Sequence, residues 1–479
     1  MRKKEKENKV AFLGEAAKEV TGSMYLVEFE DKKILLECGL YQSSKNSYLD
    51  SYRVNSKKFK FRPEDIDYVF VCHAHVDHCG LLPRLCKEGF KGKIITTDKT
   101  ALIMKELLLN SAYIVHEEAR VLSKRFARTY DPIYTEDNVF QALDKLSIYS
   151  EYDTEIALDD KVSFKWIHNS HCVGAAQLQL SLTGQNTKKR ILYTSDLGAL
   201  NTENHFVDDT VVPKEFMDLV IMESTYGDAK RKKGKSRKFD EEKIRAAVSA
   251  AQFRKGNLLF PAFSFARTQE LLFTLYRLFK DDREFDYEVV VDSVLSVDIC
   301  KLYERVLNLE DMRAWREVMA WDRLRFIKKK EESMSNISSK KRQIVISSSG
   351  FCTNGRVVPY LQEYLKNENN IICFSGYVGD NSSYLSYRIK NGKQQSTITI
   401  NHKPVKNKAN CITLSSFSSH ANRDDLIRFG SELNAACEIL VHGSKESKCS
   451  LAPAIEAEMR KKNKTTRVIP STKGMEFLF

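Results

Sequence analysis

Four side chains that can bind metal ions lie within six consecutive positions of the sequence: His73, His75, Asp77 and His78. A structural zinc site encloses one ion with four protein ligands and usually relies on cysteine. On a turn between two elements, His73 and His75 can face one point while Asp77 and His78 face another. The spacing therefore favours two adjacent metal ions over a single ion. The alternative is a histidine-rich surface loop.

Three further candidate ligands, His171, Asp196 and His442, come at or just after the ends of expected strands. A carboxylate at the end of a buried strand, as at Asp196, is well placed to bridge two cations. In isolation Asp196 could equally be a turn or helix N-cap residue. A lone histidine at position 171 would usually be structural, so the case for His171 as a ligand depends on the metal site expected around His73.

A second pair of residues is suited to moving protons. Glu223 follows the expected strand 218–222, and His420 lies in a Ser-Ser-His-Ala segment. A carboxylate that orients and charges an imidazole makes a proton donor near neutral pH. The alternative is that both are unrelated surface residues.

The elements around these residues can be predicted from hydrophobic patterning. The run 67–71 reads as a buried strand, and a helix begins after position 81 with Pro83 in its first turn. Strands are expected at 10–13, 23–28, 33–38, 68–73, 93–97, 162–168, 177–182 and 190–194, with one helical block at 100–126. Strand-rich sequence with few helices predicts two packed sheets flanked by helices.

From about residue 240 the pattern changes to alternating helices and strands. Helices are expected at 241–254, 267–279, 294–306, 310–330 and 356–366, with strands at 257–262, 287–292, 343–347 and 370–377. This alternation predicts a parallel sheet with right-handed crossovers. Short strands return at 411–414, 437–442 and 467–470. The simplest account is one strand-rich domain, 1–227 and 413–479, interrupted by an α/β insertion at 228–412.

Composition sets the broad class. The chain has 479 residues, 42% hydrophobic and 29% charged, which is ordinary for a soluble protein of two domains. Its net charge of +12 favours a polyanionic partner. Eleven scattered cysteines without a CxxC pair indicate free thiols in a reducing compartment. The charged N-terminus lacks a secretory signal and no run is long enough to cross a membrane, so a cytoplasmic location is expected.

In this order, the motifs resemble those of the metallo-β-lactamase superfamily and, within it, the β-CASP nucleases. The matching segments are 10–14 and 19–23, the HxHxDH motif at 73–78, the loop at His171, the bridging Asp196, the Glu-Ser-Thr-Tyr-Gly run 223–227, segments 261–263, 267–272 and 347–350, and the motifs at His420 and His442. The resemblance covers nearly the whole chain. It is strongest to the subgroup of the endonuclease of pre-mRNA 3′-end cleavage and its shorter prokaryotic relatives.

The resemblance implies an α/β protein in which an αββα metallo-β-lactamase sandwich is interrupted by a β-CASP cap with a mainly parallel sheet. It implies two Zn²⁺ ions, with Mn²⁺ as the alternative, held on one side by His73, His75 and His171 and on the other by Asp77, His78 and His442, with Asp196 bridging. The ions would activate a hydroxide that attacks a phosphodiester. His420, held by Glu223, would protonate the leaving oxygen, and Asp77 counts with these two as catalytic.

The expected partner is single-stranded RNA, because RNA-directed members resemble this chain in having histidine at the position of His442. A phosphate is expected at the helix start after Ser348, Ser349 and Gly350, although an ordinary βα turn is the alternative there. Lys232 and Lys233 lie in the basic run 230–238, which would attract RNA or simply be solvated. Arg267 is a candidate for lining the cleft. A second copy of this chain is a further candidate partner, in a homodimer.

Three departures from the family pattern matter. Glu37 stands where the family usually has aspartate, in a position that supports the ligand histidines, and segment 376–384 replaces a Gly-Tyr-x-x-x-Gly-Thr-Leu motif. The ligand loop has Cys-Val-Gly-Ala-Ala at 172–176 in place of the usual sequence, which is expected to be tolerated because no ligand changes. The alternatives to an RNA nuclease are a DNA nuclease of the same fold, a non-catalytic scaffold of an RNA-processing complex, and a small-molecule hydrolase. An endonuclease is favoured over a 5′-exonuclease, because the chain ends soon after His442 without a further domain.

Overall fold

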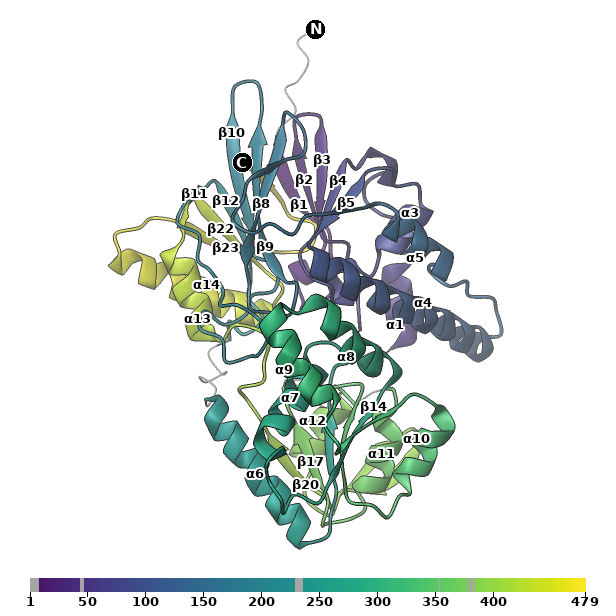
Figure 1. The fold of residues 1–479 in the computed structure, drawn as a ribbon. Helices are drawn as coiled ribbons and strands as arrows, with labels where there is room; N and C mark the ends of the chain where they lie inside the picture. Colours follow the sequence, from purple (N-terminus) through teal and green to yellow (C-terminus); the bar gives the residue numbers. More distant parts are fainter. Residues whose placement is uncertain are drawn as a thin grey trace.

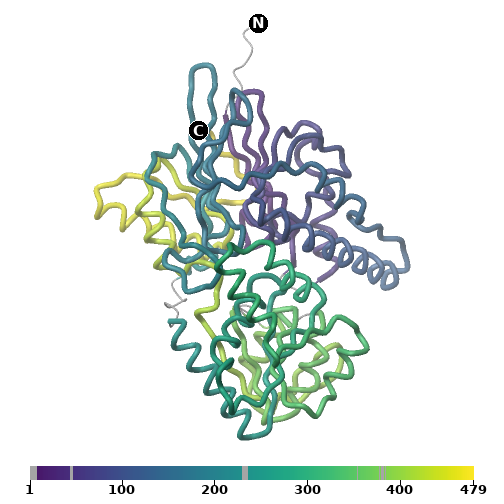
Figure 2. The backbone as a smooth tube through the Cα atoms, viewed as in Figure 1, coloured from purple at the N-terminus to yellow at the C-terminus, as the bar shows by residue number. Residues whose placement is uncertain are grey.

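A computed structural model describes residues 8–43, 47–228, 236–352, 354–376, 378, 382 and 384–479. Two seven-stranded sheets with flanking helices form the upper part of the molecule, and a six-stranded sheet with its own helices forms the lower part (Figure 1). The teal and green middle of the chain makes up the lower part, and the yellow C-terminal segment returns to the upper part (Figure 2).

The first sheet contains the strand that leads to the His73–His78 cluster. Its order is β24 (Glu476–Leu478), β1 (Lys9–Phe12), β2 (Tyr25–Phe29), β3 (Lys32–Leu36), β4 (Tyr68–Val71), β5 (Lys93–Thr96) and β6 (Leu146–Ile148). The strands from β3 to β6 are parallel, and the others are antiparallel.

The second sheet carries the other candidate ligands. Its order is β23 (Arg467–Pro470), β22 (Cys437–Val441), β12 (Leu219–Glu223), β10 (Lys188–Tyr193), β9 (Ala176–Thr183), β8 (Val162–His168) and β7 (Ile156–Ala157). Strand β9 is antiparallel to both β8 and β10, and β10, β12 and β22 are parallel. The C-terminal ends of β8, β10, β12 and β22 therefore lie at the same edge of the sheet.

The two sheets pack face to face through buried aromatic and aliphatic side chains such as Phe12, Tyr25, Trp166 and Tyr193. Helices α13 (Arg423–Glu432) and α14 (Lys445–Lys461) cover the outer face of the second sheet. On the side of the first sheet lie α1 (Tyr48–Asn55), α2 (Val76–Cys79), α3 (Leu82–Lys87), α4 (Asp98–Phe126) and α5 (Glu136–Leu143). This is the predicted αββα sandwich, and the small pair β11 (Phe216–Met217) and β21 (Asn434–Ala435) lies beside it.

The cap is built on one parallel sheet, as predicted. Its order is β15 (Leu324–Ile327), β14 (Glu288–Asp292), β16 (Gln343–Ser347), β13 (Leu258–Pro261), β17 (Ile371–Phe374) and β20 (Asn410–Thr413). Its helices are α6 (Arg237–Phe253), α7 (Arg267–Phe279), α8 (Val294–Val306), α9 (Leu309–Met319), α10 (Lys330–Ile337), α11 (Val357–Tyr364) and α12 (Leu385–Asn391). A hairpin of β18 (Thr397–Ile400) and β19 (Lys403–Lys406) completes it.

Two expectations about elements are wrong. A single helix is expected at 310–330, but this range contains most of α9, the whole of strand β15 and the first residue of α10. Residues 324–327, Leu-Arg-Phe-Ile, mix helix-forming and strand-forming side chains, and pairing with β14 makes them the edge strand of the sheet. The strand near 411–414 is β20, which pairs with β17 in the cap sheet instead of returning to the sandwich. Patterning identifies a strand but not its partner.

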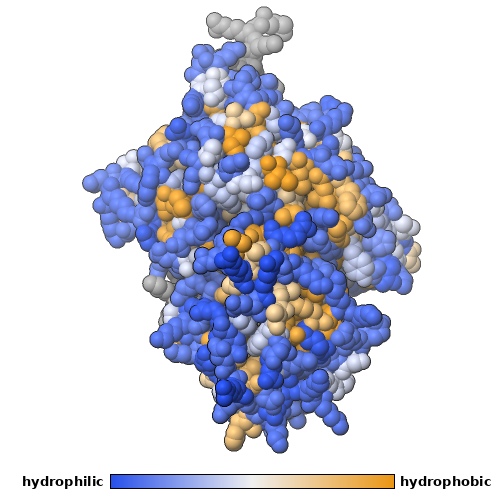
Figure 3. All heavy atoms as spheres, in the orientation of Figure 1, coloured by the Kyte–Doolittle hydropathy of each residue, from blue (hydrophilic) through white to orange (hydrophobic). Residues whose placement is uncertain are grey.

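The surface view in Figure 3 shows a face covered mostly by hydrophilic side chains, with hydrophobic ones in patches. Among the helices in the described ranges, none has the length and apolar character needed to cross a bilayer.

Candidate active site

The candidate ligands converge at one edge of the sandwich, the edge that faces the cap. His73 and His75 follow β4, and α2 carries Asp77 and His78. The remaining three candidates, His171, Asp196 and His442, follow β8, β10 and β22, whose C-terminal ends share this edge. The direction of these strands, together with the packing of the two sheets, brings together side chains up to several hundred positions apart.

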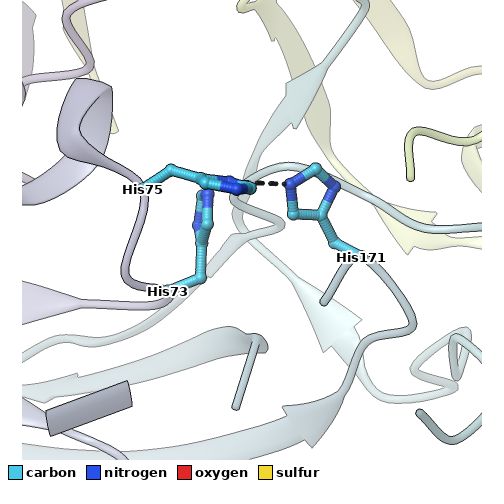
Figure 4. A group of neighbouring side chains, drawn as sticks. All are labelled: His73, His75 and His171. Carbon is cyan, nitrogen blue, oxygen red and sulfur yellow. Dashed lines mark hydrogen bonds between the residues drawn. The ribbon is translucent and has the colours of Figure 1, made fainter. Parts of the chain in front are cut away.

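The seven candidate ligands form two groups. Within each group, the potential ligand atoms lie within 4.8 Å of one another. The first group is His73, His75 and His171, and the second is Asp77, His78, Asp196 and His442. The three imidazoles of the first group point toward one another, with Nε2 of His171 3.2 Å from Nδ1 of His75 (Figure 4).

Asp196 lies between the two groups. Its Oδ2 is 3.8 Å from Nε2 of His73 and 3.7 Å from Nε2 of His171. Its Oδ1 is 3.2 Å from Nε2 of His78 and 3.3 Å from Nδ1 of His442. Each carboxylate oxygen thus faces a different group, which is the arrangement that a bridging ligand requires.

Several ligand atoms are buried without a hydrogen-bond partner among the described residues. They are Nε2 of His73, Nε2 of His78, Oδ1 of Asp196 and Nε2 of His442. A buried polar atom without a partner is costly, and native proteins seldom leave four of them in one place. Two divalent cations would satisfy these atoms, so the residues present fit a two-metal centre.

Burial sets the protonation of the first group. Loss of solvent, with the neighbouring imidazoles adding to it, lowers the pKa of His73 and His171 well below the usual value. Burial likewise lowers the pKa of His75 to about 4. All three imidazoles are therefore neutral at neutral pH, and the neutral form is the one that binds a metal ion.

Glu37 supports one imidazole of each group. Its Oε1 accepts a hydrogen bond of 3.1 Å from the Ser195 hydroxyl, and that hydroxyl lies 3.1 Å from Nδ1 of His73. The same Oε1 is 3.5 Å from Nδ1 of His78. Burial raises the pKa of the Glu37 carboxyl. Glu37 therefore reaches His73 through the Ser195 hydroxyl, and it faces His78 directly.

Sequence reasoning did not single out Ser195 or Thr225. The Thr225 hydroxyl lies 3.0 Å from Nδ1 of His442, which leaves Nε2 of that ring for a metal ion. Ser195 directly precedes Asp196, and Thr225 lies two positions after Glu223. This closeness to a candidate site residue is the signal that could have identified them.

Gly39 allows the metal-binding turn to lie against the loop after β3. A Cβ at this position would lie 1.7 Å from the carbonyl oxygen of Asp77. The backbone N–H groups of Cys38 and Leu40 donate to the carbonyls of His78 and Val76. Any side chain at position 39 would therefore push the ligand turn out of place.

The predicted acid–base pair is in contact. Nδ1 of His420 lies 3.1 Å from Oε1 of Glu223, which also accepts from the backbone N–H of Leu197 at 2.6 Å. The His420 ring centroid is 4.7 Å from that of His171, so the pair borders the ligand groups. Burial opposes protonation of His420, but the carboxylates of Glu223, Asp196 and Asp77 together outweigh it and raise the pKa of His420.

The cap contacts this edge directly. Phe265, in the loop after β13, has its ring centroid 5.3 Å from that of His75. A cavity of about 20 Å³, room for roughly one water molecule, lies between the cap and the metal-binding edge. It is lined by His171 and Ser419 from the sandwich side and by Arg267 from α7.

The candidate substrate-binding residues fall in different places. Within the described part of the chain, the Arg267 guanidinium has no hydrogen bond and no ion pair; burial, followed by repulsion from Arg237, lowers its pKa to about 10. Ser348, Ser349 and Gly350 follow β16 at the edge of the cap sheet, and the Ser348 hydroxyl donates to Ser293 at 2.9 Å. Lys232 and Lys233 lie outside the described residues.

Family models match three parts of the chain. They describe the metallo-β-lactamase superfamily at residues 17–171, the β-CASP domain at 268–383 and the Zn-dependent metallo-hydrolase RNA specificity domain at 404–467. A crystal structure of a protein of unknown function from Enterococcus faecalis has a TM-score of 0.53 at 14% identity, covering 99% of this chain and 100% of that one. That likeness concerns the fold alone.

Similar proteins include a ribonuclease of Thermus thermophilus, 28% identical over 91% of this chain and 93% of its own length. The transcription termination factor FttA of Methanocaldococcus jannaschii is 26% identical over 92% of this chain and 67% of its own. Cleavage and polyadenylation specificity factor 73 of Drosophila melanogaster is 24% identical over 92% of this chain and 61% of its own. The chain therefore belongs to the metallo-β-lactamase superfamily and carries β-CASP and RNA specificity domains.

Proposed function

We propose that this chain is a metal-dependent ribonuclease that hydrolyses phosphodiester bonds of single-stranded RNA. The observation that carries the proposal is the position of Asp196, with one oxygen toward each of two groups of buried ligand atoms, beside the Glu223–His420 pair. The printed names of several similar proteins, including a ribonuclease and a cleavage factor, support nuclease chemistry.

In this proposal His73, His75 and His171 hold one zinc ion, Asp77, His78 and His442 hold the other, and Asp196 bridges them. When bound, such a pair of ions polarises the phosphate and lowers the pKa of a water molecule. Glu37 and Thr225 keep the ligand imidazoles oriented through their hydrogen bonds. Mn²⁺ is the alternative metal.

The Glu223–His420 pair provides the acid. The Glu223 carboxylate is fixed by two backbone N–H donors, Leu197 and Thr225, so it holds the imidazole in one orientation. It also favours the protonated ring, so that His420 can give its proton to the leaving oxygen of the RNA. Neither residue needs to bind a metal ion in this role.

RNA is the proposed substrate because His420 and His442 both lie within the segment matched by the RNA specificity domain, residues 404–467. Residues 228–412 are proposed as the cap, with 1–227 and 413–479 as the two parts of the metal-binding domain. The RNA would run between them, with a phosphate near Ser348–Gly350 and another near the guanidinium of Arg267. The cavity there has room for about one water molecule, so the proposal includes a movement of the cap that admits RNA.

The alternatives are a DNA nuclease of the same fold and a non-catalytic scaffold. End-labelled single-stranded RNA and DNA of the same sequence, with zinc and then with a chelator, distinguish them. We expect metal-dependent cleavage of RNA, loss of cleavage in His73→Ala and His420→Ala, and full cleavage in His116→Ala, which changes a histidine on α4 away from the ligand groups. Cleavage of DNA alone would support the first alternative, and no cleavage at all would support the second.

The lengths of the products show whether the RNA is cut internally or from its 5′ end. We favour an endonuclease, which releases internal fragments from an RNA whose 5′ end is blocked. Stepwise release of mononucleotides from an unblocked 5′ end would show an exonuclease instead.

A further inference from the structure

The loops after β13 and β16 diverge at the edge of the cap sheet. These two strands are parallel neighbours. The first leads to α7, whose leucines pack in one buried cluster, and the second leads to α11, whose apolar residues pack in another on the opposite face of the sheet. In open α/β sheets, ligands bind in the crevice outside the strand ends where such loops separate.

Three aromatic side chains lie at this crevice. Phe263 follows β13, and its ring centroid is 5.1 Å from that of Phe351, which follows β16. The Phe351 ring is in turn 5.2 Å from Tyr384, at the end of the segment that departs from the family pattern. The Phe263 side chain is 43% exposed, whereas Ala262 and Phe265 beside it in the chain are buried. The cluster thus supports one large aromatic ring that remains open to solvent.

This ring lies directly against the candidate phosphate loop. A Cβ at Gly350 would come within 3.1–3.3 Å of three atoms of the Phe263 ring. In the loop after β13, two residues beyond Phe263, the Phe265 ring contacts His75 of the first ligand group. An aromatic surface, the candidate phosphate loop and the ligand edge therefore occur together, and they match the base and phosphate groups of one nucleotide strand.

We infer that Phe263, supported by Phe351 and Tyr384, is a stacking platform for an unpaired nucleobase of the RNA close to the cleaved bond. This inference rests on the proposed function. Stacking on an aromatic ring is tolerant of sequence, because every base has a π face. The platform therefore positions the strand over the metal-binding edge without selecting one base.

The first test measures RNA affinity in the zinc-loaded protein. Every variant carries His420→Ala, so that the RNA survives the measurement. We expect Phe263→Ala and Phe263→Leu to weaken binding of single-stranded RNA by about 5- to 150-fold, the loss expected for one stacked base, and Phe263→Trp to retain binding. The control is Phe253→Ala, a 90% exposed phenylalanine at the end of α6. Unchanged affinity in Phe263→Leu would overturn the inference.

The second test asks whether the lost affinity comes from a base. Abasic sites are placed one at a time along the RNA. At one position, removal of the base should weaken binding to the parent protein as much as Phe263→Leu does, and should add nothing in Phe263→Leu. No such position, or additive losses at every position, would contradict stacking. Zinc-dependent RNA cleavage by the unmodified chain is measured separately. Cleavage together with unchanged affinity in Phe263→Leu would contradict the stacking platform and leave the proposed function supported.

Discussion

At the scale of single residues, the candidate centre depends on side chains that hold the ligands as much as on the ligands. Glu37, Ser195 and His442 all have left-handed backbone angles, with φ of 60°, 53° and 48°. Such angles are unfavourable for residues other than glycine, and they persist where the surrounding structure enforces them. Here the backbone N–H of His442 donates to Ala16 at 2.7 Å, and the Glu37 N–H donates to Phe70 at 2.9 Å.

We predict that Glu37→Gln lowers zinc affinity about 10- to 100-fold, the effect usually seen when a partner of a ligand histidine is lost. The neutral amide oxygen still accepts from Ser195, but it attracts the ring N–H of His78 less strongly than the carboxylate does. Competition with a chromophoric chelator measures the affinity. The matched control is Glu117→Gln, an acid on α4 remote from the centre. Equal zinc affinity in both variants would contradict the supporting role.

We predict that His420→Ala lowers the rate of RNA cleavage by about 10²- to 10⁴-fold, the usual contribution of a positioned acid. Its zinc content should stay that of the parent, because His420 is proposed to donate a proton and not to bind metal. Single-turnover cleavage and metal analysis measure the two quantities. Loss of zinc together with activity would instead make His420 a ligand.

At the scale of elements, strand β22 carries a buried acid without a hydrogen-bond partner in the described part of the chain. Both carboxylate oxygens of Glu438 are buried there. Burial raises the pKa of Glu438 to about 8. The folded protein therefore keeps a proton that the unfolded chain releases near pH 4.5.

This acid makes stability depend on pH. Between about pH 4.5 and 8 the folded state binds more protons at Glu438 than the unfolded state, so the free energy of unfolding falls as pH rises. We predict that Glu438→Gln is more stable than the parent at pH 8.5 and has lost most of this advantage at pH 5. Thermal unfolding of both proteins across this range measures the difference. A constant difference would show that Glu438 does not titrate.

A buried polar cluster joins the cap to the sandwich. Glu270 of α7 accepts from the backbone N–H of His205 at 2.9 Å and lies 2.8 Å from Nδ1 of that ring. Arg237, at the start of α6, is 2.9 Å from the same carboxylate. Because His205 belongs to the loop that leads from β10 toward β11, this cluster fixes one side of the cap.

We predict that Glu270→Gln loosens this junction. Removal of one partner of a buried charged pair costs about 3–5 kcal/mol, whereas Glu304→Gln, in an exposed pair with Arg316, should cost about 1 kcal/mol or less. Faster hydrogen exchange at the His205 amide, measured by mass spectrometry or NMR, would report the loosening. Exchange as slow as in Glu304→Gln would show that other contacts hold the cap.

At the scale of the whole molecule, the net charge of +12 should draw RNA to the surface. We predict that Lys232→Ala with Lys233→Ala flattens the salt dependence of RNA binding, by about 0.7 in the logarithmic slope for each phosphate that is no longer neutralised. The control is Lys340→Ala with Lys341→Ala, exposed lysines before β16 at the other end of the cap sheet. Equal salt-dependence slopes in both double variants would show that the basic run 230–238 does not contact the RNA.

Local patterns in the sequence predict the candidate site, and they predict the class of the fold correctly. Its strong signals are local: the density of ligands at 73–78, the pattern of strand, ligand and glycine around His442, and the alternation of helix and strand in the cap. Helix α7 and strand β16 have the predicted bounds, and both contain runs of buried apolar residues.

Only the tertiary structure decided which side chains meet. The direction of β8, β10, β12 and β22 brings their ends to one edge, and this depends on strand pairing between distant segments. The same reason explains why patterning places β20 in the wrong sheet, and why it does not predict the contacts of Glu37, Phe263 and Glu270. Residue types and spacing specify what a site can do, whereas distance in space is set by packing that no local pattern contains.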